Sequence, residues 1–242
     1  MKKFTKMWAI AACALFAGTA AVNAEDYTWK FVTAGDATTY AIRSDGSLWS
    51  WGWNEKGQGG NGVSERTATP TLADGNRVWK KAVGGKAYGF FLAEDGSLWA
   101  AGTHEGGVQG TNDGIDHKVL TRIGTDNDWA DMACSRFWGY SGFAIKTNGT
   151  LWAWGKNSAG QQGIGNTQAQ TAPVQVGADM DWKQVAAGCS SVLALKTDGS
   201  LWGWGFNMYS ELFGHEGKQL SPVRLGSETD WEQVVVIDFR AY

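Results

Sequence analysis

The pattern of apolar and polar positions divides much of the chain into short segments typical of β-strands. Residues 29–52 hold three of them, WKFVTAG, YAIR and LWSWG, and Asp45-Gly46 separates the second from the third. Asp-Gly tolerates positive φ at both central positions of a two-residue turn, so a tight hairpin is predicted there. A Gly-rich segment then leads to a fourth short strand with Pro70. Because proline cannot donate to a ladder, that strand is predicted to lie at a sheet edge.

This unit recurs along the chain. Its opening tryptophans are Trp29, Trp79, Trp129, Trp182 and Trp231, at spacings of 50, 50, 53 and 49 residues. The hairpin sequence DGSLWSWG at 45–52 returns as DGSLWAAG, NGTLWAWG and DGSLWGWG. We therefore divide residues 25–242 into repeats 29–78, 79–128, 129–181 and 182–230 and a partial unit 231–242. A self-similarity of about 40 to 50 residues with four strands per unit favours a β-propeller.

The third strand of each unit is apolar on both sides. Leu48 and Trp49 point in opposite directions, and both recur in every complete unit. A strand with one wet face would alternate, so each small sheet is expected to lie between copies of itself. The predicted fold class is all-β: a β-propeller of four-stranded antiparallel blades, about four complete plus one partial, as an open arc or an incomplete propeller.

The last unit ends at Tyr242, partway through its second predicted strand. Three interpretations remain open. The sequence is truncated, or an open arc completes itself by pairing with a second copy through an unpaired blade edge. Alternatively, a ring of four or five blades closes when the strand from Trp231 docks on the first blade.

The repeat resembles that of the regulator of chromosome condensation family from Trp29 to the C-terminus. The shared pattern is W-x-x-V-x-x-G, then A-I/L-K/R-x-D-G-S-L-W-x-W-G, then N-x-x-G-Q. The resemblance implies a seven-bladed propeller of four-stranded blades that serves as a recognition platform, here in a secreted bacterial member that is apparently truncated. The histidine common in the family's first loop is absent, since DATT, KAYG and CSSV stand there, and this argues against exchange-factor chemistry.

Residues 1–24 have the features of a secretory signal peptide. Lys2, Lys3 and Lys6 precede an Ala-rich apolar run, and Val22-Asn23-Ala24 offers small residues at the cleavage positions. We expect a secreted or periplasmic protein that begins at residue 25. A lipoprotein signal ending at Cys13 is disfavoured because its apolar core would be very short.

The charge balance argues against some partners. Removing the three lysines of residues 1–24 leaves 18 basic and 24 acidic residues, a net charge of −6. Nucleic acids and anionic membranes bind most strongly to clusters of Lys and Arg, so neither is expected as the main partner of an acidic chain. No later segment approaches the ~20 apolar residues of a membrane span. Whether Cys134 and Cys189 form a disulfide is left open.

The sequence offers little catalytic chemistry. His104 takes the turn position held by Asn54 and Asn157 in other units, and His117 and His215 lie in variable loops without a partner at metal-ligand spacing. The Gly-rich segments do not open a helix as a phosphate cradle requires. We expect no catalytic, cofactor or metal site, and hence not an enzyme.

The stronger functional signal comes from aromatic residues that interrupt the repeat. They lie in loops predicted to emerge on one face of the propeller: Trp53, Tyr88, Phe137, Trp138, Tyr140, Phe206 and Tyr209. Blade packing does not require them, and exposed aromatic side chains bury large areas at low entropic cost. Our hypothesis is a protein-binding surface; a carbohydrate-binding module is the alternative, and an unrecognised hydrolase is less favoured. The competing interpretation is that Phe137 and Trp138 only plug the inserted loop.

Overall fold

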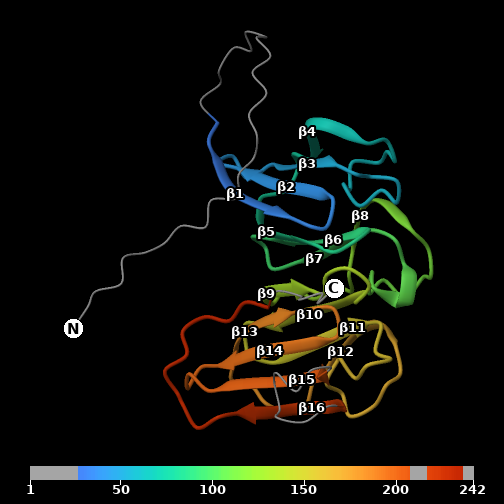
Figure 1. The fold of residues 1–242 in the computed structure, drawn as a ribbon. Helices are drawn as coiled ribbons and strands as arrows, with labels where there is room; N and C mark the ends of the chain where they lie inside the picture. The colour runs from blue at the N-terminus through green and yellow to red at the C-terminus, as the bar shows by residue number, and fades with distance from the viewer. Residues whose placement is uncertain (1–26, 208–216, 237–242) are drawn as a thin grey trace.

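Four small antiparallel sheets follow one another through the molecule (Figure 1). The computed structural model describes residues 27–207 and 217–236. The predicted signal peptide, Cys13, Tyr209 and His215 lie outside these residues. Each sheet has four strands in sequence order, so each corresponds to one predicted repeat, and we call these sheets blades 1 to 4. The predicted propeller architecture is confirmed.

The strands of the four blades have the following bounds. Blade 1 comprises β1 (Trp29–Ala34), β2 (Thr38–Arg43), β3 (Leu48–Gly52) and β4 (Thr67–Asp74). Blade 2 comprises β5 (Trp79–Gly84), β6 (Tyr88–Ala93), β7 (Leu98–Gly102) and β8 (His117–Arg122), with a short 3-10 turn, η1 (Glu105–Gly107), before β8. Blade 3 comprises β9 (Trp129–Cys134), β10 (Ser141–Lys146), β11 (Leu151–Gly155) and β12 (Gln170–Gln175). Blade 4 comprises β13 (Trp182–Ala187), β14 (Ser191–Lys196), β15 (Leu201–Asn207) and β16 (Gly217–Leu225).

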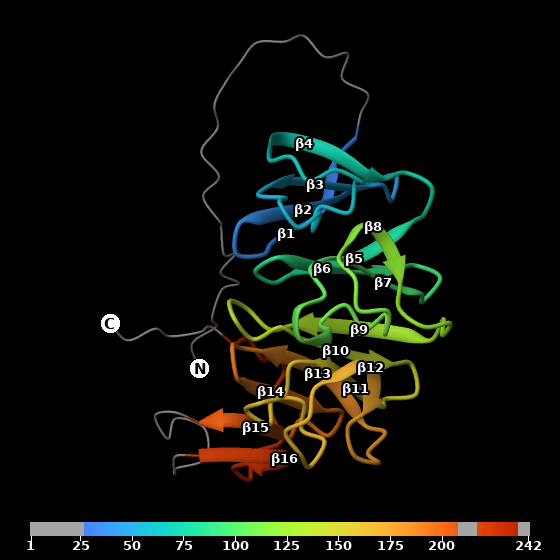
Figure 2. The same cartoon turned by 90° about the vertical axis from the view of Figure 1, so that its right-hand side faces the viewer.

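Proline marks the outer edge of three blades, as predicted. Pro70, Pro173 and Pro222 lie in β4, β12 and β16, and each of these strands pairs with one neighbour only. At the other edge, β1, β5, β9 and β13 are the strands through which consecutive blades contact one another. The first strands therefore lie innermost in the arc, and the proline strands face outward (Figure 2).

The hairpin turn differs from its prediction. The Arg43 amide donates to the Ser47 carbonyl at 3.1 Å, which closes a three-residue loop. Only Gly46 adopts positive φ, 86°, whereas Asp45 does not. The predicted two-residue turn is wrong, and the loop is a turn followed by a left-handed glycine. The reason is local: a carboxylate oxygen of Asp45 accepts the Ser47 amide at 2.9 Å, which stabilises the longer loop.

The same contact explains why Asp-Gly-Ser-Leu-Trp is repeated. The Ser47 hydroxyl donates to Asp45 at 2.6 Å and accepts the indole N–H of Trp49 at 2.8 Å. The relay runs from turn to strand and fixes the indole's orientation. It recurs in every blade, with Asn and Thr as the first two members in blade 3: Asp95-Ser97-Trp99, Asn148-Thr150-Trp152 and Asp198-Ser200-Trp202.

Consecutive blades stack through apolar faces. We call the side of a blade that carries its opening tryptophan the front face and the side that carries the hairpin leucine the back face. Leu48 of blade 1 and Trp79 of blade 2 belong to one buried cluster. Two further clusters join the back of each blade to the front of the next. The core is therefore distributed between blades, and each blade depends on its neighbours.

The prediction that the third strand is apolar on both sides holds in part. Leu48, Leu98 and Leu151 are fully buried, whereas the adjacent tryptophans Trp49, Trp99, Trp152 and Trp202 are half-buried. Each of these indoles is covered by a cation: Arg43, Arg77, Lys146 and Lys196 lie over the four rings in turn. The indoles thus lie at the rim of the stack, where a charged head remains in contact with water.

Residues 231–236 continue the stack beyond blade 4. The Trp231 amide donates to the Gly199 carbonyl at 3.3 Å, and Gln184 exchanges two hydrogen bonds with the backbone of Val234. Blades 1 and 4 lie at opposite ends of the arc in both views (Figures 1 and 2). The alternative of a small ring closed on blade 1 is therefore wrong for the described residues.

Candidate functional site

Three loops that join first and second strands meet on one face of the arc. The Asp36 amide donates to the Gly85 carbonyl at 3.2 Å, which joins the loops of blades 1 and 2. The Tyr88 hydroxyl donates to the Ser135 carbonyl at 2.6 Å, which joins blades 2 and 3. We call this the loop face. The Asp-Gly turns lie at the opposite ends of the strands, on what we call the turn face.

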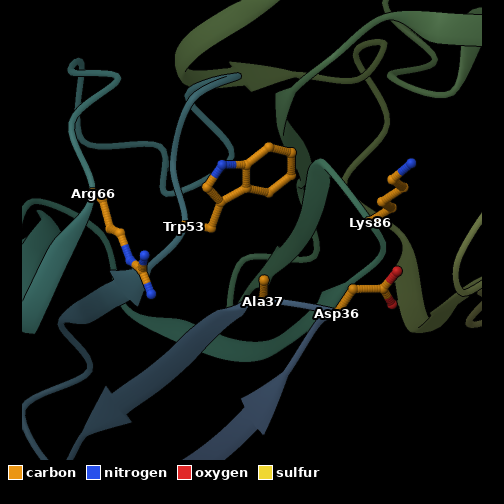
Figure 3. A pocket seen from close by; sticks show the side chains of 5 residues that line it. All are labelled: Asp36, Ala37, Trp53, Arg66 and Lys86. Atoms are coloured by element: carbon orange, nitrogen blue, oxygen red, sulfur yellow. The ribbon is translucent and has the colours of Figure 1, made fainter.

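A pocket of about 390 Å³ opens on the loop face (Figure 3). Its lining consists of Asp36, Ala37, Trp53, Arg66 and Lys86. Trp53 is held over the first loop because its amide donates to the Ala37 carbonyl at 2.8 Å, and the Thr38 hydroxyl donates to its carbonyl at 2.5 Å. The pocket therefore combines an indole with two cations and one carboxylate.

The inserted loop of blade 3 extends this surface. The Lys86 ammonium lies 2.7 Å from the centre of the Trp138 ring, and the Trp138 side chain is 50% exposed. Phe137 is 36% exposed, and its amide donates to Asp36 at 3.5 Å. Cation–π stacking keeps Lys86 between the pocket and the insertion. Trp53, Lys86 and Trp138 thus form one continuous surface across blades 1 to 3.

The insertion is held in an unusual backbone conformation. Phe137 and Tyr140 have φ of 49° and 43°, a region that residues other than glycine seldom adopt. The Ser135 hydroxyl accepts the Ser141 amide at 2.8 Å, and the Ser141 hydroxyl donates to the Lys156 carbonyl at 2.7 Å. These bonds close the base of the loop, so its tip is presented on a fixed support.

Not all of the predicted aromatic residues are exposed. Tyr88 is fully buried and Tyr140 is 3% exposed, and both belong to the core cluster between blades 2 and 3. Their inclusion in an exposed surface is wrong, because their rings fill the space at the base of the loops. Phe206 is half-buried near the end of β15, and its amide donates to the Ser190 carbonyl at 2.8 Å. Trp53, Phe137 and Trp138 remain as candidate contact residues on blades 1 and 3, and Phe206 remains a candidate on blade 4.

The pattern of aromatic residues missed the charged members of the site. Asp36, Arg66 and Lys86 lie in loops where single charges are ordinary, and no periodicity distinguishes them. One signal was present, because Asp36 and Lys86 occupy equivalent positions in two repeats and carry opposite charges. Aligning the repeats by charge would have indicated a polar feature at this position of the loop face.

Two buried ionisable groups beneath the loop face, Cys134 and Tyr88, stay protonated near neutral pH. Burial raises the pKa of the Cys134 thiol to about 12, so it stays protonated. Burial also raises the pKa of Tyr88 well above its usual value. His104 pairs with Asp116 and His117 with Asp113, in each case at 2.7 Å. In the part of the chain that the structure describes, no group of three His, Cys, Asp or Glu residues could hold a metal.

Across residues 27–207 and 217–236, no helix combines the length and the apolar character required to cross a bilayer.

The stacked sheets place the chain in the class of β-propeller repeat proteins. Residues 45–92 and 148–195 match the family model described as the regulator of chromosome condensation (RCC1) repeat, and residues 29–58 match a second model of that description. Residues 29–92 and 148–195 thus match the RCC1 repeat, as the sequence pattern indicated.

Known proteins show the same relationship. The chain is 29% identical over 163 residues to the ultraviolet-B receptor UVR8 of Arabidopsis thaliana, which covers 66% of this chain and 37% of the receptor. It is 26% identical over 150 residues to human protein RCC2, and the match covers 61% of this chain and 19% of RCC2. The chain therefore spans well under half the length of these curated relatives.

Yeast RCC1 and human WBSCR16 are two of the solved structures that share the fold. Yeast RCC1 (Prp20), solved bound to Kap60, superposes with a TM-score of 0.73 at 22% identity, over 85% of this chain and 50% of that one. Human WBSCR16 gives a TM-score of 0.70 at 19% identity, over 83% of this chain and 55% of that one. At these identities the match establishes the fold alone, and the chain corresponds to about half of each propeller.

Proposed function

We propose that the chain is an exported binding module that engages a protein partner through the loop face. The observation that carries this proposal is the pocket between Trp53, Arg66 and Lys86, together with the exposed Trp138 beside it. Large aromatic and guanidinium side chains are the residue types that dominate the energetics of protein interfaces. Propellers of this repeat commonly mediate protein interactions: yeast Prp20 was solved with Kap60 and has been examined for binding to Gsp1p and histones.

The chemistry of the pocket favours one kind of contact. Arg66 and Lys86 flank Trp53, and Asp36 is the single acid in the lining. A carboxylate from the partner would meet two cations, while an apolar group beside it would cover the indoles of Trp53 and Trp138. The chain without residues 1–24 carries a net charge of −6, from 18 basic and 24 acidic residues. The lining of this pocket differs from that overall charge, because its two cations outnumber its one acid.

Binding, rather than catalysis, fits the groups present. The candidate contact residues Trp53, Phe137 and Trp138 contribute area and stacking, and the nearby Cys134 thiol stays protonated. Export follows from the features of residues 1–24 and places the partner in the periplasm or outside the cell. Mass determination of the N-terminus of the protein recovered from the periplasm or culture medium tests this part, because a start at residue 25 is expected and an intact Met1 contradicts it.

The binding surface can be tested by site-specific photocrosslinking. A photoreactive phenylalanine analogue replaces the exposed Arg136, and the protein is irradiated in the exporting cells. Discrete crosslinked proteins are expected. Trp138→Ala and Lys86→Ala should abolish them, whereas the control Met180→Ala, which removes a 61% exposed side chain on the turn face, should leave them unchanged. Crosslinks that persist in Trp138→Ala, or none at all, would contradict the proposal.

Carbohydrate recognition is the second candidate function, because exposed indoles also stack on sugar rings. The exposed Trp138 and the half-buried Trp53 are the observation in its favour. A glycan array separates the two proposals. Selective sugar signals that disappear in Trp138→Ala would favour the carbohydrate site, and their absence together with discrete protein crosslinks would favour the protein site.

A further inference from the structure

The front face of blade 1 is uncovered, although its counterparts are buried. The opening tryptophans of blades 2, 3 and 4, Trp79, Trp129 and Trp182, are 0%, 4% and 3% exposed, whereas Trp29 is 43% exposed. The back of the preceding blade covers each of the first three. The described residues include no blade that covers Trp29 in the same way.

A second strand position repeats the contrast. Val185 in β13 is 4% exposed, and the residues at its position in β5 and β9, Ala82 and Met132, are fully buried. Their counterpart Val32 is 57% exposed. In β3, Trp51 is half-buried, whereas its counterpart Trp204 in β15 is fully buried.

Blade 1 therefore lacks the polar outer face that caps most repeat arrays. It keeps Trp29, Val32 and Trp51 at the positions that are buried in the other blades. A contiguous apolar patch of this kind marks an interaction surface. Large apolar residues of the same kind, such as Trp182 and Val185, form the front faces that pack on the back of the preceding blade within the described residues.

The back face at the other end of the arc is incompletely covered. Leu48, Leu98 and Leu151 are fully buried by the blade that follows each of them, but their counterpart Leu201 in blade 4 is half-buried. Residues 231–236 occupy part of this face without forming a strand. Trp231 there remains 44% exposed, so this segment replaces a full blade poorly.

We propose that the front face of blade 1 docks on the back face of blade 4 of a second copy of this chain. The docking blade takes the place that residues 231–236 hold, and Trp29 then donates its amide to Gly199 of the other copy. The internal interfaces supply the pattern, since Trp79 donates to Gly46 at 2.9 Å, Trp129 to Gly96 at 3.2 Å and Trp182 to Gly149 at 3.1 Å.

Two such contacts close the assembly. Each copy offers one front face and one back face, so a two-fold arrangement satisfies both without leaving a free end. The four blades described in each copy then make a ring of eight, and closed propellers hold about four to eight blades. The loop faces of both copies then lie on the same side of the ring, and the photocrosslinking test of that face is independent of this assembly.

Analytical ultracentrifugation of the purified chain tests the proposal. A species of twice the chain mass is expected at micromolar concentration. Val32→Asp should weaken association by about a hundredfold or more, because it buries an unpaired carboxylate in the interface. Met180→Asp on the turn face is the control and should associate as the unchanged chain does. Circular dichroism shows that each variant is folded.

Mixing two variants distinguishes this contact from a symmetric one. Leu201→Asp blocks the back face and Val32→Asp blocks the front face, so each variant alone should be monomeric. Together they retain one intact front and one intact back, and a two-chain species should return. A chain that is monomeric at all concentrations, a dimer unaffected by Val32→Asp, species larger than two copies, or a mixture that stays monomeric would each overturn the proposal.

Discussion

Removing the indole of Trp154 tests whether the interfaces between blades carry the stability of the fold. Trp154 is fully buried between blades 2 and 3, and its ring centre lies 5.2 Å from that of Phe90 in an edge-to-face arrangement. Its indole N–H donates to the Val108 carbonyl at 2.7 Å. Gly110 and Gly142 lie directly against the ring, so on those two sides there is no side chain that could move into the space.

The expected loss for Trp154→Ala follows from these contacts. Large-to-small substitution of a buried aromatic residue costs about 3 to 5 kcal/mol, because apolar burial is lost and a cavity remains. The Val108 carbonyl also loses its donor, which adds about 1 kcal/mol or more if the site stays dry. We therefore expect the free energy of unfolding to fall by at least about 4 kcal/mol.

Trp138→Ala is the matched control. Its ring is 50% exposed and contacts Lys86 and Tyr140. A cation–π contact at an exposed site contributes about 0.5 to 1 kcal/mol, so a loss of about 1 kcal/mol is expected. Urea unfolding followed by circular dichroism measures both variants. Equal losses, or a loss below about 1.5 kcal/mol for Trp154→Ala, would refute the assignment of these two tryptophans to core and surface.

Two further predictions concern the hairpin turns. The Ser97 hydroxyl and amide donate to Asp95 and hold its pKa below the usual 3.8, so this group stabilises the fold above that pH and its contribution is lost as the pH falls through the lowered pKa. Asp95→Asn, which introduces the residue found at the equivalent position 148, should therefore reduce the fall in melting temperature between neutral and acidic pH, and an unchanged fall would contradict the assignment. Gly96 has φ of 77°, and an added Cβ would collide with the Asn127 carbonyl. Gly96→Ala should therefore lower the free energy of unfolding, measured in urea, by about 2 kcal/mol, and an unchanged free energy would contradict this explanation.

The sequence predicted the architecture because tryptophans and prolines, which are uncommon residue types, recur at equivalent positions of the repeats. Tryptophans spaced 49 to 53 residues apart marked the blade boundaries, and Pro70 marked an outer edge. The turn prediction was wrong because Asp-Gly fits both kinds of loop: a two-residue turn requires positive φ at both residues, whereas the three-residue loop requires it only at the glycine. The deciding interaction, Ser47 donating to Asp45, depends on a side-chain rotamer that periodicity does not report.

The candidate site was predictable only in part. Trp53 and Trp138 were found because they depart from the repeat, but the same criterion selected Tyr88 and Tyr140, which are buried. Departure from the repeat shows that packing differs at a position, not on which side of the loop the ring lies. The stacking of Lys86 on Trp138 joins residues from two blades, and no local pattern encodes such a pair.

The relay from Asp45 through Ser47 to Trp49 lies within five consecutive residues. Contacts this close in sequence require almost no loop closure, so they form early on the folding timescale. Each hairpin therefore contains a local contact that does not depend on the neighbouring blade. The apolar core forms only when consecutive blades stack, so the stacking step supplies most of the stability of each hairpin.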